Sequence, residues 1–209
     1  MSTWAIVVAA GRGERFGMTH GEPKQYLPLG GRRVLDWSLE AATAHAGGVV
    51  LVVPAYAVDR HEPLASAVVA GGQTRSESVR AGLAAVPEEA AVIVVHDAAR
   101  PVPVPAVWDR VLAAVAAGAD AAVPAVPVTD TLREVGGDTV DRQRFVAVQT
   151  PQAFRAEALR RAHASTGEGT DDASLVEAAG GRVVVVDGDV ANIKITSAVD
   201  LLLAEQLCR

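Results

Sequence analysis

Short runs of apolar, often β-branched residues recur along the chain and alternate with longer stretches of helical spacing. The runs show little alternation with polar residues, which is typical of parallel strands that helices cover on both faces. The stretches between them are long enough to form crossover helices. We therefore predict an α/β fold with an open, mostly parallel, twisted sheet and helices on both faces. The predicted strands cover residues 4–10, 49–53, 67–70, 92–95, 121–126 and 183–187.

Polar residues mark the starts of two of the helices. Thr74 precedes Glu77 by three residues, and Ser197 precedes Asp200 by the same spacing. In such a capping box the two residues accept hydrogen bonds from backbone N–H groups that a first helical turn leaves unpaired. We expect a helix to follow each pair.

One segment departs from the alternation of strands and helices. Between residues 129 and 149, two β-prone stretches flank Gly136-Gly137-Asp138, which favours an antiparallel hairpin. A hairpin that leaves a domain buries little surface and is marginal in water. We predict a single domain over residues 1–209 in which residues 127–150 form a protruding β-arm that packs against a second subunit of a homodimer.

Composition narrows the class of protein. Of the 209 residues 50% are hydrophobic, so the chain can bury a core without a disulfide or a metal, and we expect Trp37 and Trp108 in that core. The net charge of −6 argues against nucleic acid as a partner. Cys208 is the only cysteine, and neither a signal peptide nor a membrane span is recognisable. We expect a cytoplasmic protein that binds no nucleic acid and no membrane.

A glycine-rich loop, Ala9-Ala10-Gly11-Arg12-Gly13-Glu14-Arg15-Phe16-Gly17, follows the first predicted strand. Its backbone N–H groups can approach an anion closely because glycine has no side chain. The spacing does not match the dinucleotide fingerprint, and the Gly-Lys pair of a Walker A loop is absent. A flexible turn with solvated arginines is the alternative.

The chain uses lysine at two positions alone. Lys24 and Lys194 are the only lysines among 19 basic residues, all others being arginine. A lysine ammonium is a compact point charge that suits a phosphate group. Both lysines are therefore candidates for an anion site, although either could be an ordinary surface residue.

Two polar segments follow predicted strands. His96-Asp97-Ala98-Ala99-Arg100 lies at a carboxyl end, where open α/β sheets bind ligands. Asp97 can bind a metal or a hydroxyl group and Arg100 a phosphate, or the two side chains can simply pair with each other. Asp187-Gly188-Asp189 can hold a metal and a sugar nucleotide, or form a turn. The chain has no G-x-S-x-G and no H-x-x-x-H, which argues against hydrolase and zinc chemistry.

The motifs in chain order resemble the 2-C-methyl-D-erythritol 4-phosphate cytidylyltransferase family from residue 5 to about residue 203. They read A-A-G-R-G-E-R, P-K-Q-Y-L, G-G-Q-T-R-S-E-S-V, H-D-A-A-R-P, D-T-L, D-R, Q-T-P-Q, T-D-D-A-S and N-I-K-I-T. The resemblance implies a Rossmann-like sheet of the nucleotide-diphospho-sugar transferase type and a homodimer interlocked by arms. It also implies transfer of CMP from CTP to methylerythritol phosphate in the non-mevalonate isoprenoid pathway, with release of pyrophosphate and with Mg²⁺ on the triphosphate.

The resemblance also implies roles for individual residues. Arg15 and Lys24 match transition-state stabilisers on the nucleotide phosphates, and Arg142 and Lys194 match residues that position methylerythritol phosphate. Positions that match CTP contacts are Ala9, Ala10, Gly11, Gly13, Gly72, Gln73 and Ser78. Positions that match substrate contacts are Asp97, Arg100, Thr131, Thr150 and Thr170, with Asp97 also the candidate metal ligand. The chain departs from the pattern in a longer loop between Arg15 and Lys24 and in Val8, where the family often has proline. No fused cyclodiphosphate synthase is expected.

Physical chemistry agrees with this set of residues. A phosphate monoester has a second pKa near 6, so it is mostly a dianion at neutral pH and attacks without a general base. The obstacle is repulsion between two anions, which fixed cations overcome even in an acidic protein. Three alternatives stay open: a cytidylyltransferase for another polyol phosphate such as ribitol 5-phosphate, a metal-dependent glycosyltransferase that uses Asp187 and Asp189, and a nucleotide-binding protein without activity.

Overall fold

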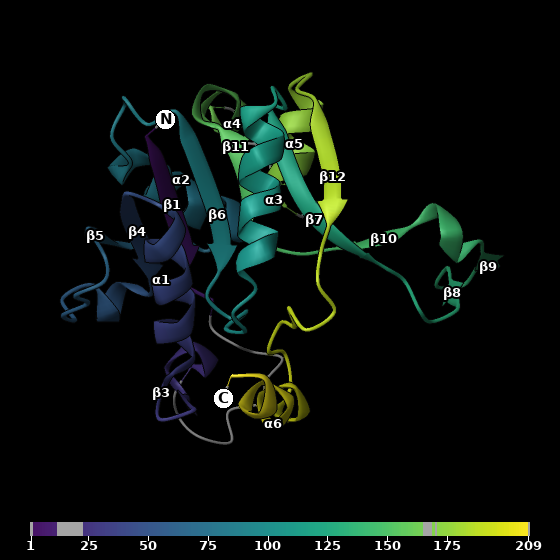
Figure 1. The fold of residues 1–209 in the computed structure, drawn as a ribbon, viewed down its shortest axis with the longest axis horizontal. Coiled ribbons are helices and arrows are strands. Elements are labelled where there is room, and N and C mark those ends of the chain that lie inside the picture. Colours follow the sequence, from purple (N-terminus) through teal and green to yellow (C-terminus); the bar gives the residue numbers. More distant parts are fainter. Residues whose placement is uncertain (1, 12–22, 165–168, 170, 209) are drawn as a thin grey trace.

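One mixed sheet organises the protein (Figure 1). The structure, a computed structural model, describes residues 2–11, 23–164, 169 and 171–208. The strands of this sheet are β1 (Thr3–Val8), β4 (Gly48–Val53), β5 (Ala67–Ala70), β6 (Val92–Asp97), β7 (Ala121–Pro127), β10 (Val146–Val148), β11 (Gln152–Arg155) and β12 (Val183–Asp187). Their order is β10-β7-β11-β6-β1-β4-β5, and β12 pairs with β7. All the strands predicted from the sequence are present, with ends that differ by a few residues.

The sheet is mostly parallel, as predicted. Strands β6, β1, β4 and β5 run parallel to one another, and β12 runs parallel to β7. Strands β10 and β11 are antiparallel to their neighbours. The carboxyl ends of β1, β4, β5 and β6 therefore meet at one edge of the sheet, where loops from distant parts of the chain come together.

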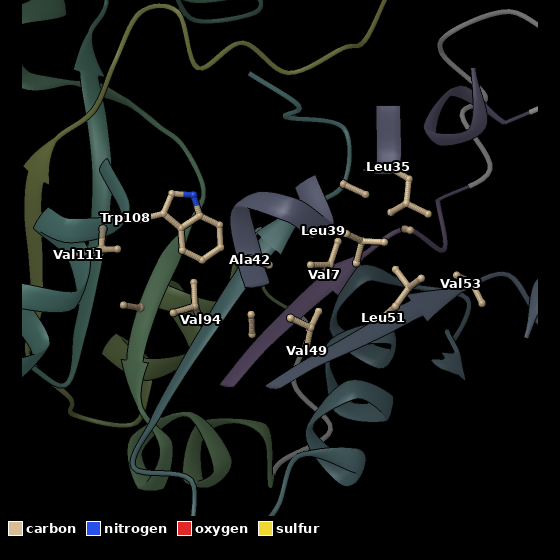
Figure 2. Packing of buried hydrophobic residues seen from close by; sticks show 14 of the residues in the cluster. Val7, Leu35, Leu39, Ala42, Val49, Leu51, Val53, Val94, Trp108 and Val111 are labelled. Carbon is tan, nitrogen blue, oxygen red and sulfur yellow. The ribbon is translucent and has the colours of Figure 1, made fainter. Parts of the chain in front are cut away.

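Helices cover both faces of the sheet because successive strand residues point to opposite sides. Helices α1 (Val34–His45) and α3 (Pro105–Ala116) pack on the face that receives Val7, Leu51 and Val94 (Figure 2). Helices α2 (Arg75–Ala85), α4 (Ala156–His163) and α5 (Asp172–Ala178) pack on the face that receives Ile6 and Ile93. A smaller apolar cluster holds the last helix, α6 (Ala198–Leu207), below the carboxyl ends of the strands. No helix in the described ranges is long and apolar enough to cross a membrane.

The two tryptophans differ in their environment. Trp108 of α3 is buried in the core, as expected (Figure 2). Trp37 of α1 is only half-buried, and it packs at the edge of the smaller apolar cluster instead of inside the core. Its indole N–H donates to the carbonyl of Leu29 at 3.0 Å, and the guanidinium of Arg32 lies 3.5 Å above the ring centre. A cation on the outer ring face keeps that face at the surface.

Both predicted capping boxes form. Thr74 Oγ1 accepts from the backbone N–H of Glu77 at 3.1 Å, and the Glu77 carboxylate accepts from the N–H of Thr74 at 3.2 Å. Ser197 and Asp200 do the same at the start of α6. Both helix starts could be predicted from the sequence because each capping contact joins residues that are three positions apart along the chain.

Removing the cap of α2 is expected to weaken the fold. The Thr74→Ala variant loses an acceptor for an unpaired N–H group, so its free energy of unfolding should fall by about 1 kcal/mol. Urea unfolding measures this change. The control is Thr43→Ala, an exposed hydroxyl in the last turns of α1, and an equal loss in both variants would contradict the capping role.

The segment between β7 and β11 contains the predicted hairpin. Strands β8 (Leu132–Arg133) and β9 (Thr139–Val140) pair antiparallel around Gly136, whose φ of +76° suits glycine. They project from the sheet to the right of Figure 1. The short 3₁₀ helix η4 (Arg142–Arg144) leads back to β10. Exposed apolar side chains of this segment are Val135, Phe145, Val146 and Val148.

The sequence did not predict strands β2 (Pro28–Leu29), β3 (Arg32–Arg33) and β11, nor that β10 pairs with β7 in the main sheet. Strand β11 is a four-residue segment inserted between β6 and β7, and its apolar pattern is too short to be recognised. Strands β2 and β3 form a small hairpin whose turn holds Gly30 and Gly31 at φ +59° and +82°. Two further 3₁₀ helices are η2 (Lys24–Tyr26) and η3 (Ala55–Ala57).

Candidate active site

A cavity of about 510 Å³ opens at the carboxyl ends of β1 and β6, next to the start of α2. Loops after these strands, the segment around η2 and the segment before α6 supply its walls. The lining residues that the sequence predicted are Ala9, Ala10, Gly11, Lys24, Gly72, Gln73, Ser78, Asp97 and Lys194. The fold thus brings together candidates that lie up to 185 positions apart, from Ala9 to Lys194.

One wall of the cavity is made of small residues and backbone. Gln25, buried under this wall, donates from Nε2 to the carbonyl of Ala9 at 2.6 Å and so fixes the start of the glycine-rich loop. Opposite lies Gly71, where an added Cβ would come within 2.4 Å of the Ala10 Cβ. Ser78 Oγ accepts from the N–H of Gly72 at 3.2 Å. The two loops therefore approach closely and leave a slot lined with backbone groups, which suits a flat base and its sugar.

The start of α2 faces the same cavity. Thr74 and Arg75 line it, and they are the N-cap and first residue of this helix. The N-terminal end of a helix carries a partial positive charge and favours an anion. A phosphate group next to the slot would therefore be stabilised from this side.

Both lysines of the chain reach the cavity. Lys24 Nζ donates to the carbonyl of Ile195 at 2.6 Å, and Lys194 Nζ donates to Asp97 Oδ2 at 2.6 Å. These contacts fix two ammonium groups in a single site. The alternative of two unrelated surface lysines is not compatible with this arrangement.

Asp97 ends strand β6 and is held between two cations. Its other oxygen, Oδ1, lies 3.5 Å from Arg75 Nε. Burial by itself would raise the pKa of Asp97, but the charges of Arg75 and Lys194 outweigh it and hold this pKa well below the usual range. The carboxylate is therefore ionised at any physiological pH.

Arg100 does not pair with Asp97, which excludes the simple alternative for these two residues. It donates instead to the carbonyls of Asn192 at 2.5 Å and Val148 at 3.5 Å. Its Nε is buried and has no hydrogen-bond partner within the described ranges, and burial lowers its pKa. Arg100 is half-buried and does not line the cavity, and its guanidinium contacts carbonyl oxygens but no carboxylate within the described ranges.

Thr150 lies beneath the cavity and does not line it. Its Oγ1 accepts from the N–H of Asp97 at 3.0 Å and lies 3.2 Å from His96 Nδ1. His96 Nε2 in turn lies 3.2 Å from the carbonyl of Arg100. The hydroxyl of Thr150, a predicted substrate contact, thus fixes the backbone of Asp97 in this structure.

The buried His96 makes stability depend on pH. Burial lowers the pKa of His96 to about 4 from 6.5. Below pH 6.5 the unfolded chain binds a proton that the folded chain rejects, so the free energy of unfolding should fall by about 2 kcal/mol from pH 7 to pH 5. Urea unfolding of the ligand-free protein measures this slope. The His96→Gln variant should lose most of it, and an unchanged slope in that variant would assign the effect to other groups.

The remaining predicted residues lie elsewhere. Thr131 and Arg142 belong to the arm and do not line the cavity; Arg142 donates to the carbonyl of Thr129 within the arm. Gly13, Arg15 and Thr170 lie outside the described residues.

The Asp187-Gly188-Asp189 segment ends strand β12 and leads into a turn, in which the N–H of Asn192 donates to the carbonyl of Asp189 at 3.0 Å. Asp189 Oδ1 accepts from the N–H of Ala191 at 2.8 Å. In the described part of the chain no group of three or more His, Cys, Asp or Glu side chains could hold a metal. Neither Asp187 nor Asp189 lines the cavity, so the structure gives no support to a glycosyltransferase that uses them there.

Sequence reasoning missed several residues of the site. Gln25, Arg75 and Thr196 line the cavity, and all three stand inside the family motifs P-K-Q-Y-L, G-G-Q-T-R-S-E-S-V and N-I-K-I-T. Gln149 and Asn192 support it from below, since Gln149 Oε1 accepts from Asn192 Nδ2 at 3.2 Å. Only the motif letters could have pointed to them, because none has an unusual residue type or spacing of its own.

Comparison with known proteins supports one interpretation of this cavity. Residues 3–209 match the family model described as IspD, 2-C-methyl-D-erythritol 4-phosphate cytidylyltransferase. The chain belongs to this family. The predicted fold class and the predicted resemblance are both confirmed, since solved members of the cytidylyltransferase family share the α/β fold of this chain.

Individual relatives are similar over nearly the whole chain. A cytidylyltransferase of this name from Saccharopolyspora erythraea is 45% identical over 98% of each chain. The crystal structure of that from Thermus thermophilus has a TM-score of 0.83 and 38% identity, and it covers 100% of both chains. A protein named bifunctional enzyme IspD/IspF from Nitratidesulfovibrio vulgaris is 41% identical over 98% of this chain, which spans 58% of that relative's length.

Proposed function

We propose that this protein transfers CMP from CTP to 2-C-methyl-D-erythritol 4-phosphate in the non-mevalonate isoprenoid pathway. The products are 4-diphosphocytidyl-2-C-methyl-D-erythritol and pyrophosphate. The observation that carries the proposal is the position of both lysines, which lie with the start of α2 around one cavity at the carboxyl edge of the sheet. Family membership supplies the identities of the two substrates.

The reaction joins two anions. An oxygen of the acceptor phosphate attacks the α-phosphorus of CTP, a new P–O bond forms, and the bond from the α-phosphorus to the β,γ-pyrophosphate breaks. The acceptor is already a dianion at neutral pH, so the site needs no general base. Lys24 and Lys194 supply positive charge where repulsion between the substrates and charge on the leaving pyrophosphate are greatest.

The small-residue wall and the cations have separate tasks. Ala9, Ala10, Gly72 and Ser78 present a slot that suits the cytidine, while the start of α2 faces the phosphates. We assign Arg100 to the acceptor phosphate on family resemblance, and the contacts of its guanidinium with carbonyl oxygens leave its positive charge without a carboxylate partner among the described residues. We assign Arg15 the same stabilising role as Lys24 on family resemblance alone, as we do for Gly13 in the nucleotide loop and Thr170 at the acceptor.

The donor set of the cavity fits a Mg²⁺ ion that arrives with the triphosphate. Asp97 is the one carboxylate among the described residues that line the cavity, and it is ionised. Mg²⁺ binds through one or two carboxylates together with substrate phosphates and water, not in an all-protein cage. Asp97 would hold the ion, which when bound offsets the negative charge of the triphosphate.

We propose that the protein is cytoplasmic and forms a homodimer. The arm carries Thr131 and Arg142 away from its own cavity, and it exposes Phe145, Val146 and Val148. A second copy that covered these apolar side chains would also receive the two polar ones. The single cysteine, Cys208, is buried, and burial raises its pKa to about 11, which suits a reducing compartment.

Pyrophosphate release tests the proposal. Each of the four ribonucleoside triphosphates is supplied with Mg²⁺, alone or with methylerythritol phosphate, ribitol 5-phosphate or a neutral sugar. CTP with methylerythritol phosphate should give the strongest signal by far. Faster release with ribitol 5-phosphate would favour the alternative acceptor, and an inactive protein that still binds CTP would favour a binding function.

A further inference from the structure

A line of polar and charged side chains connects the interior of the protein with the cavity. His163 Nε2 lies 3.0 Å from Asp172 Oδ1, and Asp172 Oδ2 lies 2.6 Å from Arg75 Nη1. Arg75 Nε then lies 3.5 Å from Asp97 Oδ1, and Asp97 Oδ2 lies 2.6 Å from Lys194 Nζ. The line therefore ends on one of the two lysines of the proposed active site.

The inner end of this line is fully buried. The side chains of Asp172 and His163 are 1% and 2% exposed. A buried carboxylate loses its hydration, and a buried ion pair is seldom more stable than well-packed apolar residues of the same volume. Stability therefore gives a weak reason for a charge at Asp172, and a role through its partner Arg75 becomes the better explanation.

The distances along the line are unequal. Arg75 makes a short contact with Asp172 at 2.6 Å and a long one with Asp97 at 3.5 Å. Asp97 makes its short contact with Lys194. Arg75 is thus held towards the interior, and the carboxylate of Asp97 is left chiefly to the lysine.

Local structure fixes Asp172 in this position. It is the first residue of α5, and the N-cap Asp171 accepts from the N–H of Ser174 at 2.9 Å. Gln152 Nε2 of β11 donates to the same Asp171 carboxylate at 3.2 Å. The start of α5 is therefore tied to the central sheet and cannot follow Arg75 if that side chain moves.

We propose that Asp172 is a positioning residue for the cytidylyl transfer: it holds the guanidinium of Arg75 off Asp97, so that Asp97 keeps Lys194 in its place in the cavity. Without the charge at residue 172, the Arg75 fork closes on Asp97 as a two-point pair. Lys194 then loses its carboxylate and its fixed position. The inference rests on the proposed function, since it concerns the same reaction.

The test compares Asp172→Asn with wild type in the pyrophosphate assay. Asparagine keeps the size and one acceptor oxygen but removes the charge. We expect kcat to fall about 10-fold, which corresponds to about 1.4 kcal/mol, while the Kd for CTP stays within about threefold because the base slot is untouched. Urea unfolding and CTP binding by calorimetry show whether the variant is folded.

Two further variants separate positioning from a structural role. His163→Gln replaces the imidazole partner of Asp172 by an amide but keeps the charge of Asp172 beside Arg75, so kcat should stay at the wild-type value. In the double variant Arg75→Gln with Asp172→Asn, kcat should be no lower than in Arg75→Gln alone, because Asp172 acts only through Arg75. Additive losses in the double variant, a wild-type kcat in Asp172→Asn, or an equal loss in His163→Gln would overturn the inference.

An Asp172→Asn variant that does not fold and a wild-type protein without activity have different consequences for the test. If Asp172→Asn does not fold, Arg75→Lys replaces it, since one ammonium cannot bridge both carboxylates as the fork does. This variant should also lose about 10-fold in kcat, and a wild-type kcat would overturn the inference. An inactive wild-type protein would instead contradict the proposed function.

Discussion

Replacing Lys24 by alanine is expected to lower turnover by at least about 100-fold, with the fold retained. The ammonium of Lys24 is fixed in the cavity by its bond to the carbonyl of Ile195 at 2.6 Å. It is therefore oriented before substrates arrive, and the loss of one such charge typically costs about 3 kcal/mol in the transition state. Steady-state pyrophosphate release measures the effect, and urea unfolding monitors the fold.

The control for Lys24→Ala is a cation outside the site. Arg161 on α4 is exposed and pairs with Glu157 at 3.5 Å one helical turn away. The Arg161→Ala variant should keep wild-type turnover because a surface pair of this kind contributes little. Near-normal turnover in Lys24→Ala would contradict the role of the lysine and would weaken the cation mechanism as a whole.

The parts of the fold that the sequence predicts are those with local signals. Residues 92–95 read as a buried strand because each is apolar, and the Thr74–Glu77 pair marks a helix start because its hydrogen bonds span three residues. Strand β11 carries no comparable signal. It is a strand because β6 and β7 flank it on both sides, which is a property of the assembled sheet.

The same distinction applies to the site. The scarcity of lysine predicted Lys24 and Lys194, and the strand-end rule predicted Asp97. Arg75 and Asp172 were not predicted, because the contact between them joins residues 97 positions apart. No local sequence pattern around either residue indicates this contact. Thr150 stands in a motif, but its position beneath Asp97 depends on how β11 enters the sheet.

The proposed binding of two anions by an acidic chain depends on where its charges lie and not on their sum. Although the net charge is −6, the described lining of the cavity holds Lys24, Arg75 and Lys194 against the single carboxylate of Asp97. The two oxygens of that carboxylate face Arg75 and Lys194. It therefore holds these two cations in place, and the positive charges of the described lining still outnumber the negative one. Local arrangement of this kind outweighs net charge at short range.

Replacing Arg142 by alanine is also expected to lower turnover about 100-fold, although this residue lies in the arm and outside the cavity of its own chain. The expectation rests on the proposed homodimer, in which each arm serves the cavity of the partner subunit. An exposed arginine that served no site would contribute almost nothing. The same pyrophosphate assay distinguishes the two cases, with Arg133→Ala in the hairpin strand β8 as the matched control.

A mixture of two inactive variants gives the sharper result. When Lys24→Ala and Arg142→Ala subunits dissociate and pair at random, about half of the dimers are mixed. In a mixed dimer one cavity has both defects, while the other combines an intact Lys24 with an intact Arg142 from the partner subunit. The mixture should therefore recover about a quarter of the wild-type activity, far above either variant remixed with itself. If each arm served its own chain, every cavity would keep one defect and the mixture would stay as inactive as its components.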